Sequence, residues 1–440
     1  MKDSAKKHIP VRERNAIVKS LRAGVTPKTG IQRMVVGRGR ELEAISRELD
    51  AMAEGTPFFR IIIGEFGAGK SFFLQLARSV ATDRDIVTLH ADLSPERRLF
   101  GTGGQPKKLY AELLRNCATR TRSANALTSI VERFITECRK TAKKEGIDTS
   151  RVINAKLENL REFLGGYDFA AVVDAYWRGF DSDNEQLKSD AVRWLRGEFA
   201  TKIEAKAALG VRTIVDDDNV YERLKLLAAF VRQAGYGGLM ICLDEMVNLY
   251  KLAMQKSRES NYEKILSILN DCLQGGAEHI GFLLGGTPEF LRDERKGLYS
   301  YEALRSRLEE NTFTRDAGVT DYDATVLELS NLTREDMLVL LRKLRDIYAS
   351  GNPEKYPVPD EALEAFLRHC FKNIGDACIR TPRNTIKEFL NFLAFLDQEK
   401  DTDWRRILDE VEVEKESNSD MPEVGGEGGS DSENFGVFTL

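Results

Sequence analysis

The feature that most constrains this chain is a glycine-rich loop between an apolar run and an amphipathic run. Residues 61–63 are three isoleucines, residues 64–71 have the sequence GEFGAGKS, and residues 72–77 form the amphipathic run. This order predicts a strand, a phosphate-binding loop of the G-x-x-x-x-G-K-S type and a helix. The glycines let successive N–H groups point at an anion, and the helix adds its positive N-terminal end.

The loop predicts a site for a nucleoside triphosphate and Mg²⁺. Lys70 is expected to reach the β- and γ-phosphates, and the Ser71 hydroxyl is expected to hold Mg²⁺. We expect the nucleotide to be bound by the whole loop and the start of the helix, which are Gly64, Glu65, Phe66, Gly67, Ala68, Gly69, Lys70, Ser71 and Phe72.

A second acidic element follows the apolar run at residues 239–243. Asp244 is expected to hold Mg²⁺, directly or through water, and Glu245 to act as general base on the attacking water. Such a base favours hydrolysis over mere storage of a nucleotide. The two carboxylates could instead cap the helix that follows.

Three further residues are candidates for catalysis or nucleotide sensing. Thr287 follows the apolar run at residues 280–286 and is expected to orient the water, or alternatively to cap the helix that begins at Pro288. Of the arginines at 305 and 307 we favour Arg307 as a residue that neutralises transition-state charge in a neighbouring subunit. Of the arginines at 380 and 383 we favour Arg383 as a contact to the γ-phosphate. Solvated surface arginines are the alternative for both pairs.

Five apolar runs predict buried parallel strands at residues 58–63, 86–90, 239–243, 280–284 and 326–329. Helical patterns separate them, so the fold class is α/β with a five-stranded parallel sheet. The long stretch from about 106 to 234 has helical spacing and predicts a helical insertion. Three helices after the last strand predict a C-terminal all-α lid.

The two ends of the chain carry opposite charge. Residues 1–40 have a balance of +9 and residues 401–440 a balance of −9. We expect a basic N-terminal arm (1–35) that contacts DNA or an acidic partner, a P-loop domain (36–330), a lid (331–400) and an acidic, mostly disordered tail (401–440). With no apolar run of membrane-spanning length and no apolar leader, we expect a cytoplasmic protein without a membrane contact.

With these parts in this order, residues 35–395 resemble the AAA+ superfamily, in the branch of the Orc/Cdc6 initiators and STAND ATPases. The resemblance includes the element VGRGRE, in which Gly37 and Arg38 are expected to lie near the adenine. It implies ATP and Mg²⁺ as cofactors, and it gives Lys70, Ser71, Asp244, Glu245, Thr287, Arg307 and Arg383 the roles stated above. Unlike the Orc/Cdc6 proteins, this chain has too few residues after the lid for a winged helix.

A closer likeness lies in the element LRAGVTP at residues 21–27, together with VGR and IGEFGAGKSF. These residues resemble the ATP-binding proteins of BREX-type phage-exclusion systems. The resemblance implies an ATPase of an anti-phage defence system, acting on DNA or on a DNA-bound complex beside a methyltransferase and other companions. A role of Arg307 in a neighbouring subunit would require a homo-oligomer. The alternatives are a STAND-like ATP-dependent switch or an assembly scaffold with little turnover.

Overall fold

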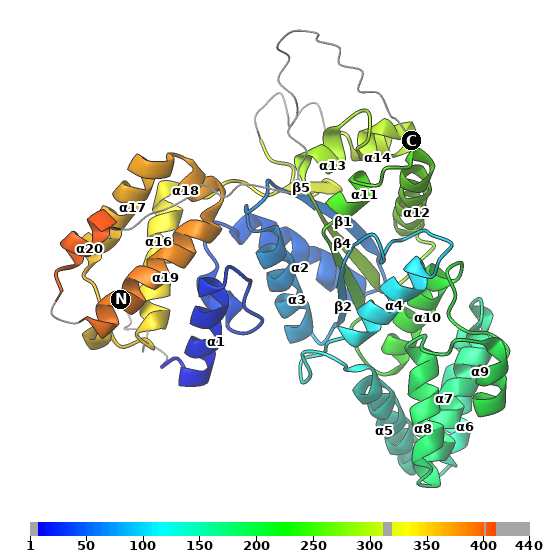
Figure 1. Ribbon diagram of the computed structural model, residues 1–440. Coiled ribbons are helices and arrows are strands. Elements are labelled where there is room, and N and C mark those ends of the chain that lie inside the picture. The colour runs from blue at the N-terminus through cyan, green and yellow to red at the C-terminus, as the bar shows by residue number, and fades with distance from the viewer. Residues whose placement is uncertain (1–7, 311–318, 400–401, 411–440) are drawn as a thin grey trace, which may run out of the picture.

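The computed structural model describes residues 8–310, 319–399 and 402–410. At its centre lies a sheet of five strands, all parallel, in the order β2-β3-β4-β1-β5 (Figure 1). All five predicted strands are confirmed, and only their ends differ by one or two residues. The strands are β1 (Phe58–Ile63), β2 (Val87–Asp92), β3 (Leu239–Asp244), β4 (Ile280–Gly286) and β5 (Val326–Glu328).

Both faces of the sheet are buried, which explains why the strands are nearly continuous apolar runs rather than alternating ones. Helices α2 (Gly39–Ala53) and α3 (Lys70–Asp83) cover one face, where Leu49 and Phe73 pack against Ile62. The opposite face packs against α4 (Gln105–Arg115), α10 (Val220–Gln233) and α12 (Gln255–Gln274).

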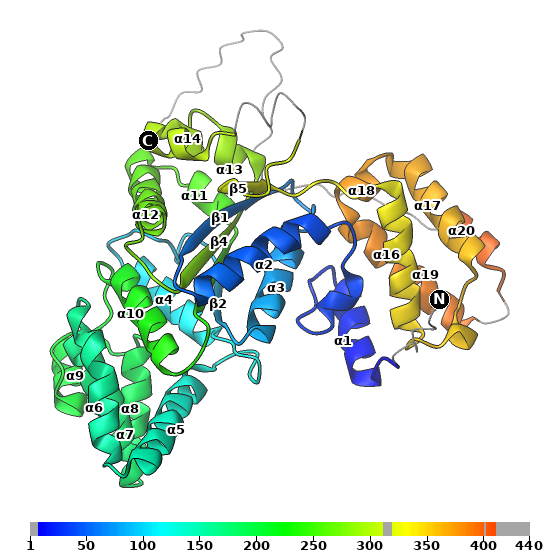
Figure 2. The same ribbon diagram turned by 180° about the vertical axis from the view of Figure 1, so that it is seen from behind.

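The stretch between β2 and β3 is helical, as predicted, and its only strand-like pairings are isolated bridges such as Thr88 to Ala118. Its first and last helices, α4 and α10, pack directly on β2 and β3. The helices between them project away from the sheet at the end opposite the C-terminal helices (Figures 1 and 2). These are α5 (Leu127–Glu145), α6 (Thr149–Glu158), α7 (Gly166–Asp181), α8 (Glu185–Leu195) and α9 (Lys202–Leu209).

A separate group of helices follows β5, and we call it the C-terminal helical group (residues 334–410). Its first helix starts with a capping box, in which Thr333 and Asp336 bond each other's backbone N–H groups. Thr381 stands at the N-cap position of α19 (Pro382–Gln398), but its hydroxyl donates to the Ala377 carbonyl at 3.0 Å instead of capping that helix. The helices are α16 (Arg334–Tyr348), α17 (Asp360–Ile374), α18 (Ala377–Arg380), α19 (Pro382–Gln398) and α20 (Trp404–Glu410).

The basic N-terminal residues are folded from Ile9 onwards. Helix α1 (Val11–Arg22) packs on α19 and α16, and Ile17 is fully buried in their hydrophobic core. Several of the cations fasten the helix: Arg14 donates to the Tyr348 carbonyl at 2.9 Å, and Arg33 pairs with Glu13 at 2.8 Å. We call residues 9–34 the N-terminal segment; it joins the C-terminal helical group instead of standing apart as an arm.

The N-terminal segment also reaches the P-loop domain. The helical turn η1 (Ile31–Met34) contacts α3, where Gln32 donates to Asp83 at 2.8 Å. The expected acidic tail lies mostly outside the described residues. Within the described ranges, no helix combines the length and the apolar character that a bilayer crossing requires.

Replacing Ile17 by Ala should lower the free energy of unfolding by about 2–5 kcal/mol, because it leaves a cavity in the core that α1 shares with α16 and α19. Urea unfolding measures this. Val11→Ala, at a 60% exposed position of the same helix, should change stability by less than about 0.5 kcal/mol. Small, equal effects in both variants would show that α1 does not pack in this way in solution.

Candidate nucleotide-binding site

The phosphate loop connects β1 to α3 at the carboxyl edge of the sheet. Gly67 and Gly69 have φ values of 79° and 92°, a left-handed conformation that only glycine adopts without strain. Lys70 begins the helix, and its Nζ donates to the carbonyls of Gly64 and Glu65 at 2.8 Å each. Burial lowers the pKa of Lys70, so this ammonium is poised for a negative partner in a partly dehydrated place.

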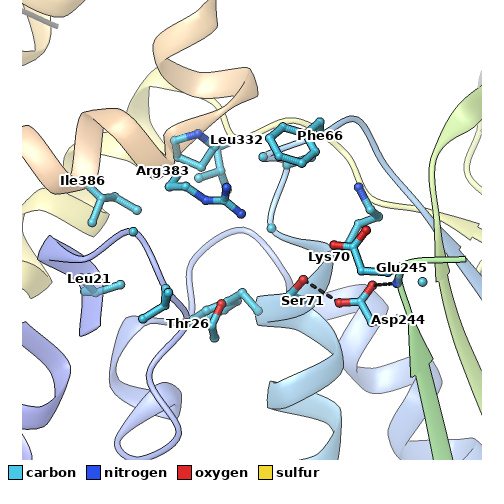
Figure 3. A pocket seen from close by; sticks show the side chains of 18 of the residues that line it. Leu21, Thr26, Phe66, Lys70, Ser71, Asp244, Glu245, Leu332, Arg383 and Ile386 are labelled. Atoms are coloured by element: carbon cyan, nitrogen blue, oxygen red, sulfur yellow. Dashed lines mark hydrogen bonds between the residues drawn. The ribbon is translucent and has the colours of Figure 1, made fainter. Parts of the chain in front are cut away.

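Asp244, the last residue of β3, connects three elements of the site. Its Oδ2 accepts the Ser71 hydroxyl at 2.6 Å and its Oδ1 accepts the backbone N–H of Glu245 at 2.9 Å (Figure 3). The neighbouring strand carries Gly285 at this level, where a Cβ would lie 2.5 Å from Asp244 Oδ1. The carboxylate therefore fits because β4 has no side chain there.

The oxygens of Ser71 and Asp244 form a donor set that suits Mg²⁺, which usually binds through one or two protein oxygens plus phosphates and water. Nowhere in the described ranges do three or more metal-ligating side chains form a dedicated cage. The residues present therefore fit a Mg²⁺ ion that arrives with a nucleotide.

Glu245 has an unusual backbone conformation, with φ at 57°. A positive φ is costly for a residue with a side chain and persists only where its surroundings enforce it. The bond from its own N–H to Asp244 and the bond from Met246 N–H to the Gly285 carbonyl at 3.1 Å fix this turn. Burial, followed by the charge of Asp244, raises the pKa of Glu245.

Asp92 is a candidate functional residue beside Asp244 that the sequence analysis missed. It ends β2 directly opposite Asp244 in the parallel register, and burial together with the charge of Asp244 raises its pKa. The sequence does contain a signal for Asp92. Residues 86–91 are largely apolar and are followed by an aspartate, as residues 239–243 are, and the carboxyl ends of parallel strands meet at one edge of the sheet.

A cavity of about 350 Å³ lies between this edge of the sheet and the C-terminal helical group. Its size falls in the range of ligand sites. In Figure 3, Lys70, Asp244 and Glu245 lie on one side, and Leu21 and Ile386 on the other. The predicted site residues that line it are Arg38, Phe66, Gly67, Ala68, Gly69, Lys70, Ser71, Phe72, Asp244, Glu245, Thr287 and Arg383.

Arg38 lines the cavity, is buried, and contacts three neighbouring residues; we call this set of contacts the Arg38 brace. Its guanidinium donates to the Ser330 carbonyl at 2.5 Å and to the Ala68 carbonyl at 3.3 Å, and it lies 3.5 Å from the Glu41 carboxylate. It thus ties the phosphate loop to the connection between β5 and α16. Gly37 does not line the cavity; with φ at 64°, it packs against the capping box of α16.

Arg383 and Thr287 approach the site from opposite sides. The Arg383 guanidinium lies 5.3 Å from the centroid of the Phe66 ring, so the first turn of α19 meets the phosphate loop. Thr287 lines the cavity and also caps α13 (Pro288–Arg292), where its hydroxyl accepts the Phe290 N–H at 3.4 Å. Both alternatives of the sequence analysis for Thr287 are compatible with this position.

Arg307 does not line the cavity of its own chain. It lies on α14 (Glu302–Leu308), where it donates to the Asn270 side chain at 2.8 Å and to the Ala303 carbonyl at 2.7 Å. Arg305 instead forms ion pairs with Glu309 at 2.7 Å and Glu294 at 3.2 Å. Of the two, Arg307 is bonded to neutral groups.

The family model of the BREX system ATP-binding proteins BrxC/D matches residues 9–412. The chain belongs to this family. The match spans the N-terminal segment, the sheet, the insertion and the C-terminal helical group, and the family implies an ATP-binding protein of a BREX system. A search of curated proteins finds no significant match.

Changing Asp92 to Asn should stabilise this BREX ATP-binding protein at pH 7. Because burial and Asp244 raise the pKa of Asp92, its charged form disfavours the folded state. The gain should therefore exist above the raised pKa, shrink as the pH falls through it, and vanish below the unfolded value of about 3.9.

Urea unfolding of both proteins between pH 7 and pH 4 measures this. Glu278→Gln, which removes a charge from an exposed loop, should show no such pH-dependent gain. A stability gain from Asp92→Asn that is equal at all pH values would contradict the electrostatic cause.

Proposed function

We propose that the chain is an AAA+-type ATPase that hydrolyses ATP with Mg²⁺ as part of BREX anti-phage defence. The observation that carries this proposal is the fixed turn at the end of β3, which holds Asp244 on Ser71 and aims Glu245 from a strained backbone. Storage of a nucleotide requires no such base. The strand order, with β4 between β1 and β3, supports the AAA+ assignment, since it puts Thr287 beside the phosphate loop.

ATP would bind with its phosphates on the loop and its nucleoside toward the apolar side of the cavity. Lys70 and the N–H groups of the loop would hold the β- and γ-phosphates, while Ser71 and Asp244 would hold Mg²⁺. The apolar lining includes Leu21, Leu340 and Ile386, side chains that suit the faces of a purine.

Hydrolysis would depend on Glu245, which takes a proton from the attacking water; its raised pKa suits a base that works near neutral pH. Thr287 would orient that water. Arg383, on the first turn of α19, would contact the γ-phosphate and so report its presence to the C-terminal helical group. Mg²⁺ supplies the charge that offsets the phosphate oxygens.

Within the defence system, we propose a cytoplasmic homo-oligomer that acts beside the methyltransferase and other companions on DNA or on a DNA-bound complex. Arg307 would enter the site of the neighbouring subunit. Arg14 is engaged with the Tyr348 carbonyl and Arg33 with Glu13. DNA contact through the N-terminal segment would therefore use the exposed Arg12, Lys19 and Lys28.

A second function, an ATP-dependent switch with slow turnover, is favoured by the Arg38 brace. Arg38 ties the phosphate loop to the connection between β5 and α16, which leads into the C-terminal helical group, so a nucleotide in the cavity would bias the position of that group. In this version hydrolysis resets the switch and is not itself the work performed.

Lys70→Ala should abolish ATP binding, because it removes the cation that meets the phosphates. Glu245→Gln should keep ATP binding but lower turnover at least about a hundredfold, because the amide takes up no proton. Titration calorimetry and phosphate release measure the two effects, with Glu278→Gln as an exposed control.

Binding and turnover by Glu245→Gln equal to the wild type would contradict the base role. Phage protection in cells separates the two functions: protection that survives Glu245→Gln favours the switch, and its loss favours the turnover ATPase.

Arg307→Ala should lower turnover about a hundredfold or more, because it removes a positive charge supplied in trans. An equimolar mixture with Lys70→Ala should regain activity, since the Lys70→Ala subunit supplies Arg307 to the intact phosphate loop of its neighbour. Phosphate release over a range of protein concentrations measures this, and Arg305→Ala serves as the matched variant. No recovery in the mixture would exclude a role in trans.

A further inference from the structure

The apolar side of the cavity is closed by residues that precede the P-loop domain in the chain. The last turn of α1 contributes Leu21 to the lining, and the turn that follows α1 contributes Gly24–Pro27, on the side facing α16 and α19. Among these residues Thr26 has the only polar side chain. Figure 3 shows it between the side with Lys70 and Asp244 and the side with Leu21 and Ile386.

Backbone bonds hold the residues before Thr26 in place, and a proline follows it. The N–H of Gly24 donates to the Leu21 carbonyl and the N–H of Val25 to the Ser20 carbonyl, each at 3.0 Å. Gly24 has a φ of 70°, and a Cβ added there would lie 3.7 Å from Arg383 Cδ. Pro27, which is buried, fixes the next φ. Thr26 is therefore presented to the cavity from a defined backbone.

All three polar groups of Thr26 lack a protein partner. Its N–H, its carbonyl and its hydroxyl make no hydrogen bond to any residue that the structure describes, although the residue is partly buried. Because Thr26 is partly exposed and lines the cavity, these groups are open to a ligand bound there. The cavity lining also includes the apolar side chains of Met34, Leu344 and Ile386, and Arg383 lies beside Gly24.

We propose that Thr26 is the residue that hydrogen-bonds the nucleoside of the bound nucleotide. Its hydroxyl both donates and accepts, so it can bond a ribose hydroxyl or a polar edge of the base. Since Figure 3 shows Thr26 apart from Lys70 and toward Leu21, we assign its hydroxyl to the nucleoside and not to the β- and γ-phosphates. The inference rests on the proposed ATP site and adds a recognition role for the N-terminal segment. ATP bound in this way would link residues 9–34 to the phosphate loop.

The test is binding of AMP-PNP with Mg²⁺, measured by titration calorimetry. Thr26→Val keeps the side-chain shape but removes the hydroxyl, so it should raise Kd about three- to tenfold. Thr26→Ser keeps the hydroxyl and should stay within about twofold of the wild type. Thr29→Val is the matched control, because Thr29 is exposed three residues further on and does not line the cavity.

Two analogues then identify the partner of the hydroxyl. If the ribose is the partner, 2′-deoxy-ATP should bind wild type and Thr26→Val equally well; if the base is the partner, the triphosphate of purine riboside should do so. Binding is measured in the presence of Mg²⁺ for each pair.

Equal Kd values for wild type and Thr26→Val, with binding lost in Lys70→Ala, would overturn the role of Thr26 and leave the ATP site standing. Absence of binding by the wild type would overturn both. A loss shared by Thr26→Val and Thr29→Val, with a lowered melting temperature in both, would show a structural effect and also overturn the inference.

Discussion

The carboxylate of Asp244 is the contact on which the site depends. It holds the N-terminus of α3 through Ser71 and the turn after β3 through the Glu245 N–H, and the missing side chain of Gly285 makes room for it on β4. Three elements far apart in the sequence thus converge on two oxygen atoms. Because each strand is buried on both faces, the sheet cannot shift to relieve this contact, and the geometry is set before any ligand arrives. Such prior organisation is what a site needs if it is to act on charge that develops during a reaction.

The cavity lies where two hydrophobic cores meet. One core belongs to the sheet and its covering helices, and the other unites the C-terminal helical group with the N-terminal segment. Leu76 of α3 packs in the second core, although its helix covers the sheet. Val36, Leu42 and Phe72 of the P-loop domain also pack against this second core. Polar contacts, such as the bond from Lys343 to the Val35 carbonyl, join the same two bodies. A ligand with one end on the phosphate loop and the other against Leu340 and Ile386 would add further contact between the two bodies, so binding and the placement of the C-terminal helical group would be coupled.

The sequence predicted those parts whose signals are local. Apolar runs marked the five strands, and the pattern of glycines with Lys70 and Ser71 marked the loop, because strand and loop formation depend on residues adjacent in the chain. The N-terminal segment was missed as a packed element because the partners of Arg14 and Ile17 lie more than 300 residues away, and its charges suggested a free arm. Asp92 was missed because its significance comes from the register of β2 against β3, which composition does not reveal. Whether Arg307 acts in a neighbouring subunit depends on an assembly, and no pattern within one chain specifies that.

The site gathers like charges at a cost in stability. Asp92 and Asp244 are paired in the register of the adjacent strands β2 and β3, and Glu245 follows Asp244 in the chain. Burial and mutual repulsion raise the pKa values of Asp92 and Glu245. The nearby cation, Lys70, is itself weakened by burial and bonds backbone carbonyls. A strained turn at Glu245 adds to this cost. A fold selected only for stability would replace such a cluster by neutral residues. The cluster lies at the carboxyl edge of the sheet, beside a loop that presents N–H groups to an anion. Its presence there is accounted for if bound Mg²⁺ and phosphate together balance the charges of the site.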